Sequence, residues 1–126
     1  MRVALDTNRL TDLFQGDAAL AEWLGTCDEV WIPLVVLAEI KAGFYGAQGR
    51  RNEALLQEFL GKATVGVLLP ARETAERYAR LFVQLKRAGT PIPDNDLWIA
   101  ALALEHDLTL ITRDRHFERI PQLLRG

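Results

Sequence analysis

The sequence has 126 residues and a formal net charge of −2, and 49% of its residues are hydrophobic. This length and composition suit one globular domain over residues 1–126, and the charge excludes binding to nucleic acid through a bulk positive field. No apolar run approaches the ~20 residues of a membrane span, and the one cysteine excludes an intramolecular disulfide framework. Because Asp6 interrupts the N-terminus too early for a signal peptide, we expect a soluble cytoplasmic protein without a membrane span.

The first predicted element is a buried strand over Arg2–Asp6, a short apolar run that ends at a carboxylate. The polar residues Thr7 and Asn8 follow directly. In open parallel sheets, ligands bind at the carboxyl ends of strands. Two interpretations of Asp6 therefore stay open: it is a site ligand, or it is a turn or cap residue that starts a helix toward Phe14.

A second strand is predicted over Glu29–Ile32, and Pro33 then starts a helix from about Leu34 to Phe44. Glu39 lies inside this helix. Its neighbours on the helix surface are the uncharged residues Val35, Val36, Ala42 and Gly43. Because burial of an unpaired carboxylate costs several kcal/mol, Glu39 either leaves the core through an unfavourable rotamer or meets a partner, which is a distant arginine or lysine or a bound ligand.

Three elements without expected chemistry surround this helix in the chain. Asp17 caps a short helix that Gly25 ends, and a helix over Asn52–Leu60 carries an apolar stripe that serves either the core or a subunit contact. The stripe consists of Leu55, Leu56, Phe59 and Leu60. A strand is predicted over Val65–Leu69, which Pro70 stops.

A long amphipathic helix is predicted over Ala71–Ala88. Its expected inner face consists of Ala75, Tyr78, Phe82 and Leu85. The opposite face carries Glu–Arg pairs at the i,i+4 spacing, which is typical of a solvated surface.

Two carboxylates, Asp94 and Asp96, follow the stiff segment Pro91–Pro93 and precede an apolar run over Leu97–Leu104. The pattern predicts a helix to His106 with both acids in its first turn. One cap is enough for a helix, so Asp94 is either that N-cap or an auxiliary ligand. The run is apolar on every face, as in a buried helix, and a carboxylate at Asp96 on such a helix requires a cation.

The last predicted strand, Leu108–Thr112, ends next to Arg113, Asp114 and Arg115. Asp114 is either a site ligand or a turn aspartate paired with one of these arginines. His116 lies beside an aromatic residue, and we interpret it as a loop or packing residue outside the catalytic set. The remaining tail is expected to pack loosely on the sheet.

Alternating strands and helices predict an α/β fold with a mostly parallel sheet, in which strand ends and the first turns of following helices share one edge. Asp6, Asp96 and Asp114 would lie at that edge, and Glu39 could reach it. Clustered carboxylates repel one another unless a cation holds them. With no cysteine or histidine array nearby, Mg²⁺ or Mn²⁺ is favoured over Zn²⁺.

Such a site suits phosphodiester hydrolysis, because a divalent metal activates water and neutralises charge that develops on phosphate oxygens. Thr7, Asn8 or Thr112 could position the water or a metal-bound ligand, and Arg113 and Arg115 could supply local phosphate contacts.

These residues together resemble the PIN-domain ribonucleases, and in particular the VapC-like toxins of toxin-antitoxin pairs. The resemblance covers essentially the whole chain. It rests on Asp6-Thr7-Asn8, Glu39, the segment 93–101 that contains Asp96, and Leu110–Asp114 followed by Phe117. It implies a three-layer α/β/α sandwich and a Mg²⁺- or Mn²⁺-dependent endoribonuclease that acts on RNA.

The resemblance also implies a homodimer and inhibition by a cognate antitoxin whose C-terminal segment covers the active site. Asp6, Glu39, Asp96 and Asp114 match the acidic quartet of the family, of which the last acid is the most variable. Thr112 matches the polar residue near that last acid, and Asp94 has no fixed counterpart.

Two other classes of protein remain as alternatives. A metal-dependent phosphatase or phosphotransferase of the haloacid-dehalogenase type requires a second aspartate where Asn8 stands, and a receiver-type phosphoacceptor requires a lysine where Arg113 stands. The non-enzymatic alternative is a PIN-fold module that only binds RNA or a protein. The sequence does not select an RNA target or the number of metal ions.

Overall fold

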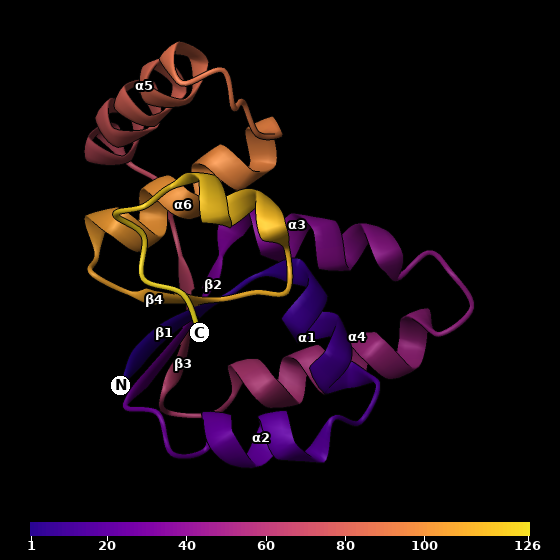
Figure 1. The fold of residues 1–126 in the computed structure, drawn as a ribbon. Coiled ribbons are helices and arrows are strands. Elements are labelled where there is room, and N and C mark those ends of the chain that lie inside the picture. Colours follow the sequence, from indigo (N-terminus) through magenta and orange to yellow (C-terminus); the bar gives the residue numbers. More distant parts are fainter.

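The computed structural model describes residues 1–126, and its centre is a four-stranded parallel sheet in the order β3-β2-β1-β4 (Figure 1). The strands are β1 (Arg2–Leu5), β2 (Glu29–Pro33), β3 (Val65–Leu68) and β4 (Thr109–Ile111). Residues 3–5 of β1 are fully buried, because this strand is central and both faces of the sheet are covered. The predicted α/β class with a parallel sheet is confirmed.

Helices cover both faces of the sheet, which gives the expected three layers (Figure 1). One side carries α1 (Thr7–Phe14), α2 (Ala18–Leu24) and α4 (Gly49–Leu60), and the other carries α5 (Arg72–Arg87) and α6 (Asp94–Glu105). The helix α3 (Leu34–Gly43) contacts both α1 and α6. A short 3₁₀ helix, η1 (Arg115–Arg119), follows β4. None of the helices combines the length and the apolar character that crossing a membrane requires.

The helix α6 is the buried helix that its apolar run predicted. Leu97 and the residues from Ile99 to Ala103 are all buried, since α6 packs against α5, α3 and the sheet. Its first turn is thereby fixed at the carboxyl edge of the sheet, beside the end of β4. This placement carries Asp96 into the candidate site.

The predicted inner face of α5 was right at Leu85, which is buried, and at Tyr78, which packs against the core, and wrong at its other two positions. The buried residues are Thr74, Leu81 and Leu85, whereas Ala75 is exposed and Phe82 is 48% exposed. A threonine can occupy the buried row because its hydroxyl donates a hydrogen bond to Glu105 at the end of α6 and accepts one from the backbone of residue 71. Hydrophobicity alone therefore placed Ala75 and Phe82 on the inner face in error and missed Thr74 and Leu81.

The apolar stripe of α4 belongs to the core, since Leu56 and Phe59 are buried. The helix begins at Gly49, three residues earlier than predicted, and a Cβ atom at this position would lie 1.7 Å from the carbonyl oxygen of Phe44. The C-terminal tail is bound to the sheet edge more regularly than expected: the Leu110 N–H donates to the Leu124 carbonyl at 2.8 Å, next to an isolated parallel bridge.

Candidate active site

The site begins where β1 and β4 end side by side. Leu5 is in register with Ile111, so Asp6 and Thr112 emerge together. Asp6 is only 5% exposed, and its carboxylate accepts hydrogen bonds from the Thr7 backbone at 2.8 Å, the Thr112 hydroxyl at 2.6 Å and the Asn8 amide at 3.2 Å. Asp6 is therefore the N-cap of α1, as one interpretation held, and also a rigidly oriented carboxylate at the sheet edge.

Two of the predicted auxiliary residues connect this carboxylate to the loop after β4. The Asn8 side-chain oxygen accepts a hydrogen bond from the Arg113 backbone at 3.2 Å, and the Thr112 hydroxyl accepts one from the Asp114 backbone at 2.9 Å. The same two side chains thus orient Asp6 and position the loop that carries Asp114. The Thr7 hydroxyl is buried and has no hydrogen-bonding partner.

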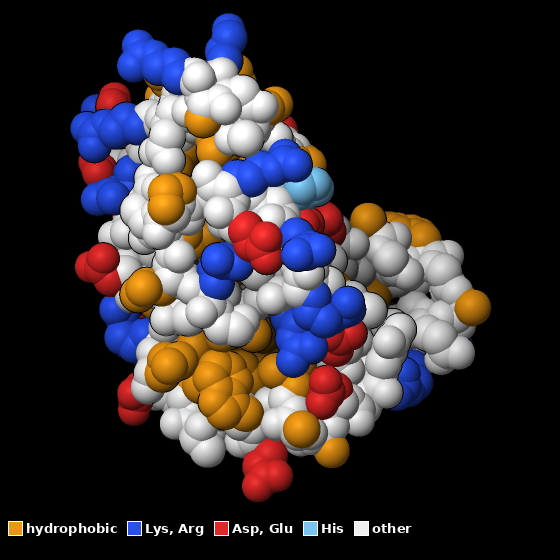
Figure 2. Space-filling view, in the orientation of Figure 1, with side chains coloured by type: hydrophobic (Ala, Val, Ile, Leu, Met, Phe, Trp, Pro, Cys, Tyr) orange, Lys and Arg blue, Asp and Glu red, His pale blue; other side chains and the backbone are white.

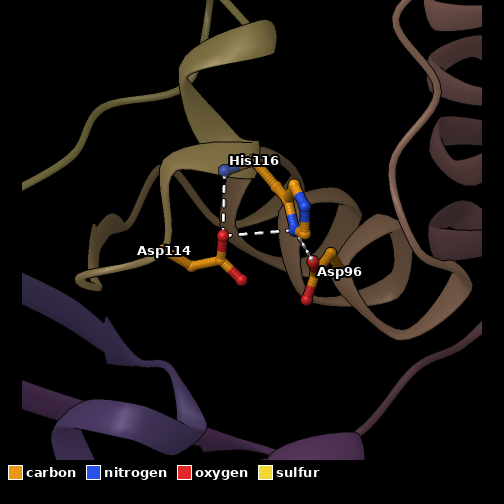
Figure 3. Close-up of side chains that lie close together, drawn as sticks. All are labelled: Asp96, Asp114 and His116. Atoms are coloured by element: carbon orange, nitrogen blue, oxygen red, sulfur yellow. Dashed lines mark hydrogen bonds and ion pairs between the residues drawn. The ribbon is translucent and has the colours of Figure 1, made fainter.

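Asp96, Asp114 and His116 form the tightest cluster of potential metal ligands, with one atom of each within 4.8 Å of the others (Figure 3). The His116 Nδ1 atom lies 3.1 Å from Asp96 Oδ2 and 3.1 Å from Asp114 Oδ1. The Asp114 Oδ1 atom also accepts a hydrogen bond from the His116 backbone at 2.9 Å, as the N-cap of η1.

His116 is the site residue that our sequence interpretation left out. The sequence did contain one signal for His116, its position two residues after Asp114. A short turn after a strand can bring two such side chains to the same side of the chain. Its contact with Asp96 could not be read from the sequence, since the two residues come from η1 and α6.

The electrostatics of the site connect all the predicted acids. The pKa of Asp96 is raised to about 6, mainly by burial and with added contributions from the charges of Asp114 and Asp6, while His116 opposes the rise. Burial also raises the pKa of Glu39, with an added contribution from the charge of Asp6 and an opposing one from Thr7. Asp6 and Glu39 lie outside the tightest cluster, but their charges act within the same site.

Glu39 lines a hollow of about 250 Å³ together with Thr7, Thr11, Phe14 and Asn52. No arginine or lysine contributes to its pKa, so the alternative of a distant basic partner does not hold. Glu39 is exposed, so its carboxylate avoids burial without a basic partner, and its place at this hollow leaves it accessible to a ligand.

Asp94 does not cap α6, contrary to one of its two interpretations. Pro93 occupies the N-cap position, and the Asp94 carboxylate accepts a hydrogen bond from the Tyr78 hydroxyl of α5. The Tyr78 ring stacks on Trp98 with centroids 4.4 Å apart, and the hydrogen bond raises the pKa of Tyr78. Asp94 therefore turns toward α5, while Asp96, two residues on, turns toward η1.

The two arginines proposed for phosphate contact differ in their surroundings. The Arg113 guanidinium donates two hydrogen bonds to Asp12, at 2.8 and 2.9 Å, and lowers the pKa of that carboxyl. The Arg115 side chain is 88% exposed and lies 3.7 Å from Glu118. Neither arginine pairs with Asp114, so the expected pairing was wrong, although Asp114 does act as a turn residue because it caps η1. Acidic and basic side chains alternate over this face of the molecule (Figure 2).

The donor set fits a divalent cation. It combines carboxylate oxygens and one imidazole nitrogen. The pKa of Asp96 is raised because this carboxyl is buried beside two other carboxylates, and a bound cation would remove the electrostatic cost of ionising it. This site therefore has the composition of a metal-dependent hydrolase centre at the carboxyl edge of a parallel sheet.

The chain belongs to the PIN domain family, whose model matches residues 3–123. It is 34% identical over 97 residues to "Ribonuclease VapC1" of Haemophilus influenzae (strain R2866), a match that covers 76% of this chain and 72% of that protein. Within the family the chain is VapC-like, as the sequence resemblance implied.

Solved structures agree with this assignment. VapBC2 from Rickettsia felis, bound to a DNA fragment from their promoter, matches with a TM-score of 0.88 and 27% identity over 100% of this chain and 98% of that chain. VapBC-5 from Mycobacterium tuberculosis, described as a member of the VapBC family of toxin-antitoxin systems, matches with a TM-score of 0.74 and 29% identity over 99% of this chain and 98% of that chain.

Proposed function

We propose that this protein is an endoribonuclease that uses a divalent metal ion, Mg²⁺ or Mn²⁺, to hydrolyse RNA phosphodiester bonds. The observation that carries the proposal is the convergence of Asp6, Asp96 and Asp114 at one sheet edge, where two of these charges raise the pKa of the third. The ribonuclease name of the Haemophilus influenzae relative supports RNA as the substrate.

Asp96, Asp114 and His116 would hold the ion, with the charges of Asp6, just after β1, and of Glu39 in α3 close to it. When bound, the metal would supply an activated water and neutralise charge on the phosphate. Thr112 and Asn8 fix the orientation of the Asp6 carboxylate through their hydrogen bonds. The Glu39 carboxylate lines a hollow together with Thr7, which opposes the rise in its pKa, and would be available there to bind a water molecule.

The proposal includes a biological role as the toxin of a toxin-antitoxin pair in the cytoplasm. The similarity to VapBC complexes supports a cognate antitoxin as the partner. We also propose a homodimer, as the family resemblance implies. Phe82 and Val83 of α5, which are 48% and 42% exposed, are the apolar side chains on that helix available for a subunit contact.

Incubation of the purified protein with total RNA tests the proposal, with Mg²⁺, Mn²⁺ or EDTA in parallel reactions. We expect discrete fragments that need metal and that disappear with Asp96→Asn. Asp107→Asn is the matched control, because Asp107 is an exposed acid just beyond the other end of α6 with φ of 53°, a conformation that asparagine tolerates. Equal cleavage by Asp96→Asn would point to a contaminating nuclease or to a different site.

A further inference from the structure

His116 directs one ring nitrogen at two carboxylates at once (Figure 3). Its Nδ1 atom is 3.1 Å from both Asp96 Oδ2 and Asp114 Oδ1. Nδ1 can carry only one proton, which lies in the ring plane, so it cannot form two linear hydrogen bonds. The Asp114 oxygen in addition already accepts the backbone N–H of residue 116. The contact with Asp96 has hydrogen-bond geometry, whereas the equally short contact with Asp114 does not, so a hydrogen bond accounts for only one of the two.

The same spacing suits shared coordination of a metal ion. In an octahedral site with metal–ligand bonds of about 2.1–2.2 Å, neighbouring ligand atoms lie about 3.0–3.1 Å apart. Both nitrogen–oxygen distances at His116 equal that separation. The side chain is also accessible to an ion, since 40% of its surface is exposed while Asp96 is mostly buried below it.

We propose that His116 Nδ1 is itself a ligand of the catalytic cation, and that the site consequently prefers a first-row transition ion such as Mn²⁺ over Mg²⁺. The inference rests on the metal dependence put forward under the proposed function. Its physical basis is ligand chemistry: imidazole is a good ligand for transition ions, whereas Mg²⁺ prefers oxygen ligands and retained waters. The sequence-based choice between Mg²⁺ and Mn²⁺ was open because it counted no histidine in the site.

The competing interpretation is that His116 only orients Asp96 and Asp114 from outside the metal shell. His116→Asn separates the two roles, because the side-chain amide nitrogen can take the place of Nδ1 as a hydrogen-bond donor but cannot coordinate a metal through that nitrogen. His106→Asn is the matched control. It changes the only other histidine of the chain, which lies at the far end of α6 beside Glu105.

The test measures metal binding without RNA. Pulsed electron paramagnetic resonance of the Mn²⁺-loaded wild-type protein reports directly coordinated nitrogen, and calorimetric titrations give the affinities for Mn²⁺ and Mg²⁺. We expect a coordinated nitrogen signal in the wild type and in His106→Asn that is absent in His116→Asn. His116→Asn should lose at least about tenfold in Mn²⁺ affinity, with a change of less than about threefold for Mg²⁺.

Absence of coordinated nitrogen in the wild type would overturn the inference without reference to any variant, and so would unchanged Mn²⁺ affinity in His116→Asn. If the wild type cleaves RNA with either metal but shows no nitrogen signal, the nuclease proposal stands and only the role of His116 falls. If the wild type binds neither ion, both proposals fail together.

Discussion

The metal-free protein should become more stable at neutral pH when Asp96 is replaced by asparagine. Burial holds the pKa of this carboxyl at about 6 in the folded protein, against an ordinary value of 3.8. A raised pKa means that the folded state binds the proton more tightly than the unfolded state does. The stabilising contribution of Asp96 is therefore complete below about pH 3.8 and is lost as the pH rises through about 6.

The size of the effect follows from this difference. The pKa of Asp96 differs between about 6 in the folded state and 3.8 in the unfolded state, and each pKa unit corresponds to about 1.4 kcal/mol. At neutral pH the ionised carboxylate therefore destabilises the folded state by about 3 kcal/mol. The Asp96 side chain is only 14% exposed, so solvent screens little of this cost. Asparagine loses the contact between the Asp96 carboxylate and the His116 ring, worth about 1 kcal/mol. The net gain at pH 7.5 is about 2 kcal/mol, or roughly 8 °C in Tm for a domain of this size.

Urea unfolding in EDTA measures this gain, with the wild type, Asp96→Asn and the control Asp107→Asn compared at pH 7.5 and at pH 3.5. We expect Asp96→Asn to exceed the wild type at pH 7.5 and to lose the advantage at pH 3.5, where Asp96 is protonated. A variant less stable than the wild type at pH 7.5 would refute the reasoning, because it would mean that protein partners, rather than a missing cation, balance the Asp96 charge.

Three further outcomes follow from the same contacts. Thr112→Val should lower the cleavage rate by about 10- to 100-fold, because Asp6 loses its hydroxyl donor, and Thr112→Ser should restore most of it in RNA cleavage assays. Thr74→Val should cost about 1–3 kcal/mol in urea unfolding, since it leaves the partly buried Glu105 carboxylate without its hydroxyl donor, while cleavage per folded molecule stays unchanged. Mn²⁺ at about 100 times its Kd should stabilise the wild type by about 2.7 kcal/mol in a thermal melt, and a similar gain in Asp6→Asn would contradict a role for Asp6 in the metal site.

Parts of the site were predictable because their signals are local. Apolar runs closed by Asp6 and by Thr112 predicted strand ends, and a helix apolar on every face predicted the burial of α6. Parallel topology then requires these ends to share an edge, whatever the details of packing. The sequence could therefore indicate which carboxylates converge.

The residues that the sequence misjudged are those whose partners lie on other elements. The buried row of α5 depends on Glu105 of α6, the Asp94 carboxylate is taken by Tyr78, and Arg113 is held by Asp12 of α1. Each such pairing is set by packing between helices, which hydrophobic periodicity does not specify.

By itself, the amino-acid sequence determined the α/β architecture and the acids at its carboxyl edge, because strand ends and helix starts are encoded by neighbouring residues. Only the tertiary structure decided that an imidazole joins two of those acids, because His116 meets Asp96 across twenty residues through the packing of η1 on α6. The identity of the donor atoms, and with it the choice of metal ion, is a property of the folded chain.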